Sequence, residues 1–305
     1  MRGTFIIYLL FVCLFKTPAQ GLGTIKTDKD CLHFIHSELK SYGSFYFDTI
    51  FTKQEIKRLK IQEPIRNWEV FDFNGDHKPD LYFVGRLRAP YSEHEHLACL
   101  YLSNGKGGYD LIPLTRGDFS LYSPLIFRRT NHSKQLLFIY CIITLLNHES
   151  SNQIIKRKAT LYPKGLMSVD TLVYKYGRVI NYATAPSNLI FDSIIFERND
   201  GLVYRIHKEG FVAIHHARSN DSYFETFKVT PTKLSLLKTL VKEIDLTSTD
   251  IDFSTGLFDL PGITLSIYSQ GNKIVISDYG MQASFTLMAI YRLIESLYED
   301  RWTQM

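Results

Sequence analysis

The stretch Trp68–Leu87 reads WEVFDFNGDHKPDLYFVGRL, and it decides how the first half of the chain folds. Residues 68–73 and 81–87 are rich in aromatic and branched apolar side chains, which are typical of β-strands. Between them lies a loop made mostly of Asp, Asn, Gly and Pro, the residue types that form turns. The stretch therefore predicts two strands whose connection carries several oxygen-bearing side chains.

Those oxygen-bearing side chains recur at the first, third, fifth and ninth positions of the loop 72–80, and they are Asp72, Asn74, Asp76 and Asp80. Calcium is a hard cation that takes about six to eight oxygen ligands. The backbone carbonyl of Lys78, at the seventh position, can add another oxygen. Three carboxylates this close together repel one another unless a cation lies between them. The spacing predicts a calcium site with a structural role, and the open alternative is an ordinary turn with solvated acids.

Two positions separate this loop from an EF-hand. Phe83 stands at the twelfth position, where an EF-hand has a bidentate Glu, and strands rather than helices flank the loop. His77 stands at the sixth position, where Gly is usual. We expect a positive φ angle there, which His tolerates better than most residues, and we do not expect His77 to be a ligand, because imidazole suits softer metals.

A third predicted strand ends in Leu102-Ser103-Asn104-Gly105-Lys106-Gly107-Gly108-Tyr109, and a fourth follows to Leu114. Together with the loop, residues 68–114 resemble an FG-GAP or VCBS repeat, in which an Asp-rich loop joins two strands and an Asn-Gly-Lys-Gly turn closes the repeat. The resemblance implies calcium at the loop and a four-stranded sheet like one propeller blade. A complete propeller needs about 4–8 blades. Because one clear copy is found, we expect a lone or degenerate blade within a small domain, not a complete propeller.

Residues 1–19 have the anatomy of a secretory signal peptide. Arg2 precedes an apolar run from Thr4 to Phe15, and Thr17-Pro18-Ala19 offers small residues for cleavage. The run is much shorter than the roughly 20 apolar residues of a membrane-spanning helix. We therefore expect a periplasmic or extracellular protein with no stable membrane span after cleavage, and an uncleaved, anchored form is the alternative.

The rest of the chain predicts an α+β protein of two domains. Residues 20–185 are expected to be β-rich, behind a helix at 31–42 capped by Asp30 and a short helix at 53–59. Further strands are expected at 125–128, 135–146, 153–162 and 169–179. Residues 189–305 are expected to form an antiparallel sheet covered by two helices, with strands at 189–197, 202–207, 211–217, 223–229, 263–268 and 273–278. Thr230, followed by Pro231, and Ser284 mark the starts of the two helices.

Residues from about 190 to 300 resemble an uncharacterised domain of exported Bacteroidota proteins. The resemblance lies in Asp192-Ser193-Ile194-Ile195-Phe196, the Thr230-Pro231 helix start, Asp259-Leu260-Pro261 and the run from Ile274 to Gly280, which ends in Asp-Tyr-Gly. It implies no known activity. We interpret Asp278 as a turn residue that forms hydrogen bonds.

Composition and motifs limit the function without fixing it. The net charge of +4 comes from 35 basic and 31 acidic residues that are dispersed along the chain, so nucleic-acid binding is not expected. The three cysteines Cys31, Cys99 and Cys141 could form one disulfide bond, although apolar surroundings favour free thiols for Cys99 and Cys141. We find no hydrolase or nucleotide-binding motif. We expect a non-enzymatic binding or structural protein whose partner is a protein or a cell-surface glycan, and the alternative is an exported hydrolase with a site between the domains.

Overall fold

The computed structural model describes residues 21–47, 66–88, 95–105, 107–114, 122–131, 134–143, 166–183, 186–187, 189–216, 223–245, 262–279 and 283–300. They form two compact units. The N-terminal unit holds the described residues up to 143 together with 166–169, and the C-terminal unit holds those from 170 onward. The predicted signal peptide, the predicted helix at 53–59 and the predicted strand at 153–162 lie outside the described residues.

The N-terminal unit is built on an antiparallel sheet. Its strands are β1 (Phe45–Tyr46), β2 (Trp68–Phe71), β3 (Asp80–Leu87), β4 (Glu95–Ser103) and β5 (Tyr109–Pro113). Strands β2, β3, β4 and β5 pair in chain order, so they form the expected four-stranded, blade-like meander. The short strand β1 pairs with the far end of β3, at Arg86 and Leu87.

Helix α3 (Asp28–Glu38) and the short 3-10 helix η1 (Lys40–Tyr42) precede most of this sheet in the chain. The predicted cap at Asp30 is wrong, because the helix begins earlier and Thr27 is its N-cap. Asp30 instead occupies the third helical position. Its carboxylate accepts a hydrogen bond from Thr27 N at 2.9 Å while the Thr27 hydroxyl accepts one from Asp30 N at 3.2 Å. This reciprocal capping box satisfies backbone donors that the first turn would otherwise leave unpaired.

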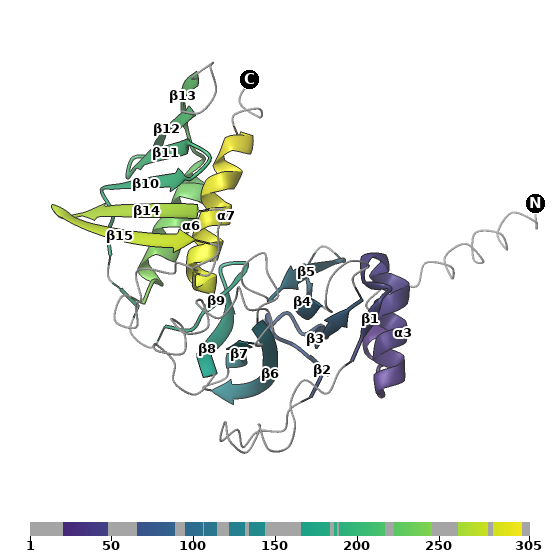
Figure 1. The fold of residues 1–305 in the computed structure, drawn as a ribbon. Helices are drawn as coiled ribbons and strands as arrows, with labels where there is room; N and C mark the ends of the chain where they lie inside the picture. The colour runs from purple at the N-terminus through teal and green to yellow at the C-terminus, as the bar shows by residue number, and fades with distance from the viewer. Residues whose placement is uncertain are drawn as a thin grey trace, which may run out of the picture. The chain divides into compact units, whose positions relative to one another are not determined.

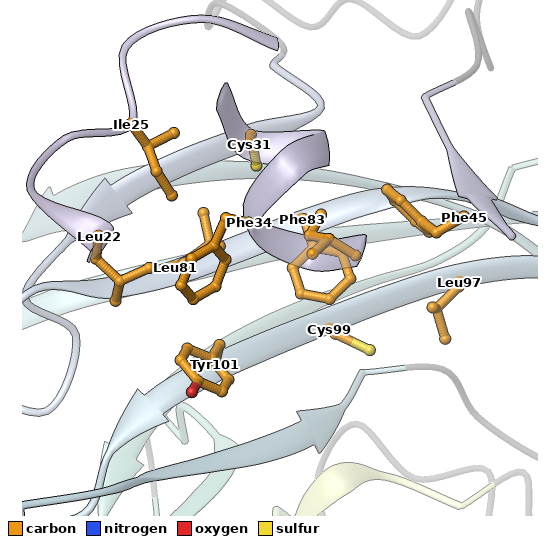
Figure 2. Packing of buried hydrophobic residues seen from close by; sticks show 11 residues of the cluster. Leu22, Ile25, Cys31, Phe34, Phe45, Leu81, Phe83, Leu97, Cys99 and Tyr101 are labelled. Carbon is orange, nitrogen blue, oxygen red and sulfur yellow. The ribbon is translucent and has the colours of Figure 1, made fainter. Parts of the chain in front are cut away.

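The core of the N-terminal unit lies between α3 and one face of the sheet. Figure 2 shows Phe34 and Cys31 of α3 directed toward Leu81, Phe83 and Tyr101 of the strands, and all five side chains are buried. The rings of Phe34 and Tyr101 meet edge to face, with their centroids 5.6 Å apart. Strand β6 (Tyr122–Asn131) contacts β4 and β3, and apolar residues on both faces of β3 and β4 are buried.

A further antiparallel sheet has the strand order β6-β7-β8-β9. Its remaining strands are β7 (Lys134–Ile143), β8 (Leu166–Lys175) and β9 (Arg178–Asn181). The prediction of one strand over 169–179 is wrong. Tyr176 and Gly177 have positive φ angles of 54° and 72° and form a tight turn, so the segment folds into the β8–β9 hairpin.

The main part of the C-terminal unit is a six-stranded antiparallel sheet with two helices on one face (Figure 1). Its strands are β10 (Ser193–Arg198), β11 (Leu202–His207), β12 (Phe211–His216), β13 (Tyr223–Lys228), β14 (Gly262–Ser269) and β15 (Asn272–Tyr279), in the spatial order β13-β12-β11-β10-β14-β15. The helices are α6 (Pro231–Lys242) and α7 (Phe285–Asp300). The expected α+β fold, with a C-terminal antiparallel sheet and two helices, is confirmed.

Both predicted helix starts of the C-terminal unit are confirmed by hydrogen bonds. The Thr230 hydroxyl accepts one from Lys233 N at 3.4 Å, with Pro231 following the cap. The Ser284 hydroxyl accepts one from Leu287 N at 3.3 Å. Both bonds satisfy first-turn amides that have no partner inside the helix.

Candidate metal loop at residues 72–80

The loop 72–80 connects β2 to β3 and turns through two residues with positive φ. Gly75 has a φ of 78° and His77 has a φ of 63°. The expectation for His77 is therefore confirmed. Its imidazole is almost fully exposed, with Nδ1 3.9 Å from an Asp72 oxygen, so the side chain extends into solvent rather than into the loop. His77 is therefore explained by the positive φ that the turn requires, not by any chemistry of its imidazole.

Side-chain oxygens hold the loop in shape by accepting hydrogen bonds from its own amides. Asp72 accepts from Gly75 N at 2.7 Å and from His77 N at 2.9 Å. Asn74 Oδ1 accepts from Asp76 N, and Asp76 Oδ1 accepts from Lys78 N, both at 2.9 Å. Each of these oxygens has two lone pairs, so one hydrogen bond leaves capacity for a second partner. The alternating Asp and Asn side chains are therefore explained by the loop amides that need acceptors, whether or not a metal ion binds.

Asp80 begins β3 and is fully buried. One carboxylate oxygen accepts hydrogen bonds from Phe73 N at 2.7 Å and Asn74 N at 3.3 Å, and the other accepts one from Ser103 N at 2.8 Å. Burial raises the pKa of Asp80 above its ordinary value, and the negative charge of Asp76 adds to this, although the three backbone hydrogen bonds oppose it. Asp80 therefore ties the start of the loop to the end of β4 at an electrostatic cost.

Ser103, the last residue of β4, is the residue that links the loop to the rest of the sheet. Its hydroxyl donates to Asp76 Oδ2 at 2.5 Å. The side-chain amide of Asn74 donates to the Ser103 carbonyl at 2.7 Å and to its hydroxyl at 3.0 Å. Burial raises the pKa of Asp76, but the hydrogen bonds from Ser103 and Lys78 outweigh it and hold the pKa below its ordinary value. Sequence reasoning missed Ser103, because a Ser before Asn-Gly looks like an ordinary turn residue.

Tyr109, the first residue of β5, brings a phenol to the same region. Its ring stacks on that of Tyr101, with centroids 4.6 Å apart and planes 3° apart. Its hydroxyl oxygen is buried and has no hydrogen-bond partner in the described part of the chain. Burial raises the pKa of Tyr109, and the charges of Asp80 and Asp76 raise it further. A buried polar atom without a partner costs free energy, so the Tyr109 hydroxyl is a donor that no described residue satisfies.

The loop brings together some of the predicted ligands and not others. Asp76, Asp80 and Asn74 all form hydrogen bonds with Ser103. Asp72 instead accepts hydrogen bonds from amides within the loop. The amide of Lys78 donates to Asp76. Within the described ranges, no three side chains of the types His, Cys, Asp and Glu are grouped as they would be around a metal ion. The donor chemistry nevertheless fits calcium, because every predicted ligand atom is an oxygen and three of the side chains are carboxylates.

Two thiols of the N-terminal unit, those of Cys31 and Cys99, are buried rather than reactive. Cys31 and Cys99 are free, and both lie in the cluster between α3 and the sheet. Burial raises the pKa of each to about 12. A thiol with so high a pKa is a poor nucleophile. These cysteines therefore fill core volume, and the side chain of Cys141 is outside what the structure describes.

Two aspartates of the C-terminal unit serve turns. One Asp278 oxygen accepts a hydrogen bond from Ala283 N at 3.1 Å, which confirms its interpretation as a turn residue. Asp192 accepts from Gln270 N at 2.8 Å and from Lys208 Nζ at 3.1 Å. It thereby joins the turn after β14 to the turn after β11. Both aspartates therefore have local structural roles.

Comparison of the chain with protein-family models, curated proteins and solved structures gave no match. Among the helices that the structure describes, none is long and apolar enough to cross a membrane.

Proposed function

We propose that this chain is an exported, non-enzymatic binding or structural protein whose N-terminal unit carries one structural calcium site. The side chains of Asp72, Asn74, Asp76 and Asp80 and the carbonyl of Lys78 would hold the ion. When bound, the ion would supply positive charge and a cross-link between the loop and β4, rather than reaction chemistry. The blade-like meander of β2 to β5 agrees with the resemblance of residues 68–114 to an FG-GAP or VCBS repeat.

The observation that carries this proposal is the pair of carboxylates on Ser103. Asp80 is fully buried, and Asp76 bonds to the same serine. Among the described residues, no Lys, Arg or His side chain forms an ion pair with either of them, although the charge of Lys78 helps to lower the pKa of Asp76. Two nearby carboxylates with one of them buried are mutually unfavourable unless a cation compensates. Calcium is the cation whose ligand preferences match an all-oxygen loop.

A calcium titration of residues 20–305, followed by calorimetry and by thermal melting, tests the proposal. Extracellular calcium modules bind at about 10⁻⁴–10⁻³ M. If the dissociation constant is about 0.1 mM, then 10 mM calcium is about 100 times that value and should stabilise the N-terminal unit by about 2.7 kcal/mol. Magnesium at the same concentration should stabilise less, because it requires a smaller octahedral site.

The Asp76→Ala variant should lose the calcium response. Asp110→Ala is a matched control, since Asp110 is an exposed acid in the same unit that accepts a hydrogen bond from Asn104. The control should keep the full response. An unchanged melting temperature of the wild-type protein in 10 mM calcium would show that residues 72–80 are a hydrogen-bonded turn and nothing more.

A further inference from the structure

One face of the six-stranded sheet in the C-terminal unit is left open by the helices. In the pairing register, Ile194, Phe196 and Tyr204 share the face that is buried, and the ring of Phe196 lies 5.7 Å from that of Tyr291 in α7. Successive side chains of a strand point to opposite faces. The alternate residues therefore lie on the face turned away from α6 and α7 (Figure 1).

This open face carries aromatic side chains in exposed positions. Phe211 in β12 is 57% exposed and Phe224 in β13 is 66% exposed, and Val275 in β15 is also exposed. Tyr268 in β14 is half-buried on the same face. These side chains are spread over the face from β13 to β15, so a partner that lies across the strands could contact several of them.

The same face has a clear excess of positive charge. Its register positions hold the cations Arg205, Lys228 and Lys273 against a single acid, Glu197. Neither Arg205 nor Lys273 forms an ion pair with an acidic side chain of the described residues. Asp192, the residue before β10, is paired with Lys208. The face is therefore complementary to an anionic partner.

The cations and the aromatic rings are arranged in one line across the strands. Lys228 pairs with Phe211, and its ammonium lies 5.4 Å from the centre of that ring. Farther across the sheet Ser193 pairs with Tyr268 and Tyr268 with Lys273, whose ammonium lies 5.6 Å from the tyrosine ring. His207, opposite Ser193 on β11, lies between the two aromatic groups. We call these six residues the cationic row: Lys228, Phe211, His207, Ser193, Tyr268 and Lys273.

The spacing within the cationic row favours a chain-like partner of a particular kind. Phe211 and Tyr268 stand on strands three places apart, which is about 14 Å at the usual strand spacing. Between them are the hydroxyl of Ser193 and the imidazole of His207, which can donate to and accept from hydroxyl groups. Single-stranded nucleic acid is bound by aromatics on which successive bases stack. The cationic row instead offers separated rings, hydrogen-bonding groups between them and a cation at each end.

We infer that the open face of the C-terminal sheet binds an acidic polysaccharide along the cationic row. Phe211 and Tyr268 would contact the apolar faces of sugar rings, and Lys228 and Lys273 would pair with carboxylates of the chain. This inference rests on the proposed binding function and names its partner. It is independent of calcium, because all the residues involved belong to the C-terminal unit.

Binding of polygalacturonate to residues 20–305 tests the inference, measured by calorimetry at low salt with EDTA present. EDTA removes any contribution of the loop 72–80, so a failure of this experiment is distinct from a failure of the calcium titration. We expect wild-type protein to bind the polyuronate and not neutral dextran, with an affinity that falls as salt is added. Replacement of both end cations, Lys228→Gln with Lys273→Gln, should weaken binding about tenfold.

A matched variant has the same change of charge on the helical side of the unit. Lys238→Gln with Lys242→Gln removes two exposed cations of α6 and should leave the affinity within about twofold of wild type. Phe211→Ser should weaken binding without changing the net charge. Equal weakening by both lysine pairs would overturn the inference in favour of non-specific attraction. Absence of binding by the wild-type protein would also overturn it, as would tighter, Phe211-dependent binding of an oligothymidylate.

Discussion

Removal of the Ser103 hydroxyl measures how firmly the loop 72–80 is attached to the sheet. The Ser103→Ala variant loses the donor to Asp76 Oδ2 at 2.5 Å and the acceptor for Asn74 Nδ2 at 3.0 Å. It keeps the backbone bonds to Asp80 and Asn74, because these use the Ser103 amide and carbonyl. The variant therefore isolates the side-chain contribution.

The magnitude follows from the type of each bond. A hydrogen bond to a charged group contributes about 1.5–3 kcal/mol and a neutral one about 1 kcal/mol. Asp76 is only partly buried, so water replaces much of the lost donor, and Asn74 keeps its second bond. We expect Ser103→Ala to lower the free energy of unfolding by about 1–2 kcal/mol without calcium. At a urea dependence of about 2 kcal/mol/M, the midpoint should fall by about 0.5–1 M.

Urea unfolding followed by the fluorescence of Trp68, in a background that carries Trp302→Phe, reports on the N-terminal unit alone. The sequence contains two tryptophans, and Trp68 lies in β2 opposite Phe83 of β3. Ser37→Ala is the matched control, because the Ser37 hydroxyl donates only to the carbonyl of Phe34 in its own helix. The control should change stability by less than about 0.5 kcal/mol. A Ser103→Ala variant as stable as this control would refute the role given to Ser103.

Three further predictions concern the N-terminal unit. Gly85→Ala should destabilise it by about 3 kcal/mol in the same urea assay, because the added methyl would collide with the Tyr46 carbonyl and lie 2.6 Å from the Phe45 ring. The control Gly43→Ala should be neutral, because the nearest atom to its added methyl is 3.5 Å away. Hydrogen bonds from Thr27 and Lys26 hold the pKa of Asp30 below its ordinary value of 3.8. Its contribution is thus present above that value and is lost as pH falls through the folded pKa. Asp30→Asn should therefore lower the melting temperature at pH 7 and leave it unchanged at pH 2, and an equal effect at both would contradict the capping role. Cys31 and Cys99, with pKa values raised by burial to about 12, should resist maleimide labelling at pH 8 until guanidinium unfolds the protein, as mass spectrometry of labelled peptides would show; rapid labelling of native protein would contradict the burial of both thiols.

Local signals predicted the C-terminal elements most closely. Thr230 before Pro231 and Ser284 before a periodic apolar stripe each begin a helix where expected, because a cap satisfies amides within its own turn. The strand at 202–207 has the predicted bounds. The single strand predicted over 169–179 is wrong because a turn interrupts it at Tyr176 and Gly177. Tyr is not a residue type that predicts a positive φ, so the sequence gives no signal at Tyr176. Only the following Gly177 indicates a turn.

Some features of the loop 72–80 could be predicted from the sequence, and others depend on the tertiary structure. The alternation of Asp72, Asn74 and Asp76 is visible in the sequence, because these side chains bond to amides a few residues away. Asp80 could be identified as an acid of the loop, but its full burial could not, because the burial depends on β4 lying beside β3. Ser103 is 23 residues from Asp80 and reaches it only through that pairing.

Periodicity and neighbours within a few residues were enough to predict the class of the fold, the starts of α6 and α7 and the all-oxygen donor set of the loop, whereas the start of α3 was misplaced. The tertiary structure alone decided which acid is buried, which serine links two carboxylates and which face of the second sheet carries the cationic row. Phe211 and Tyr268 are 57 positions apart in the chain and share that face through the register of four strands. Strand register sets which side chains share a face, and that register is fixed by long-range pairing that no short stretch of sequence contains.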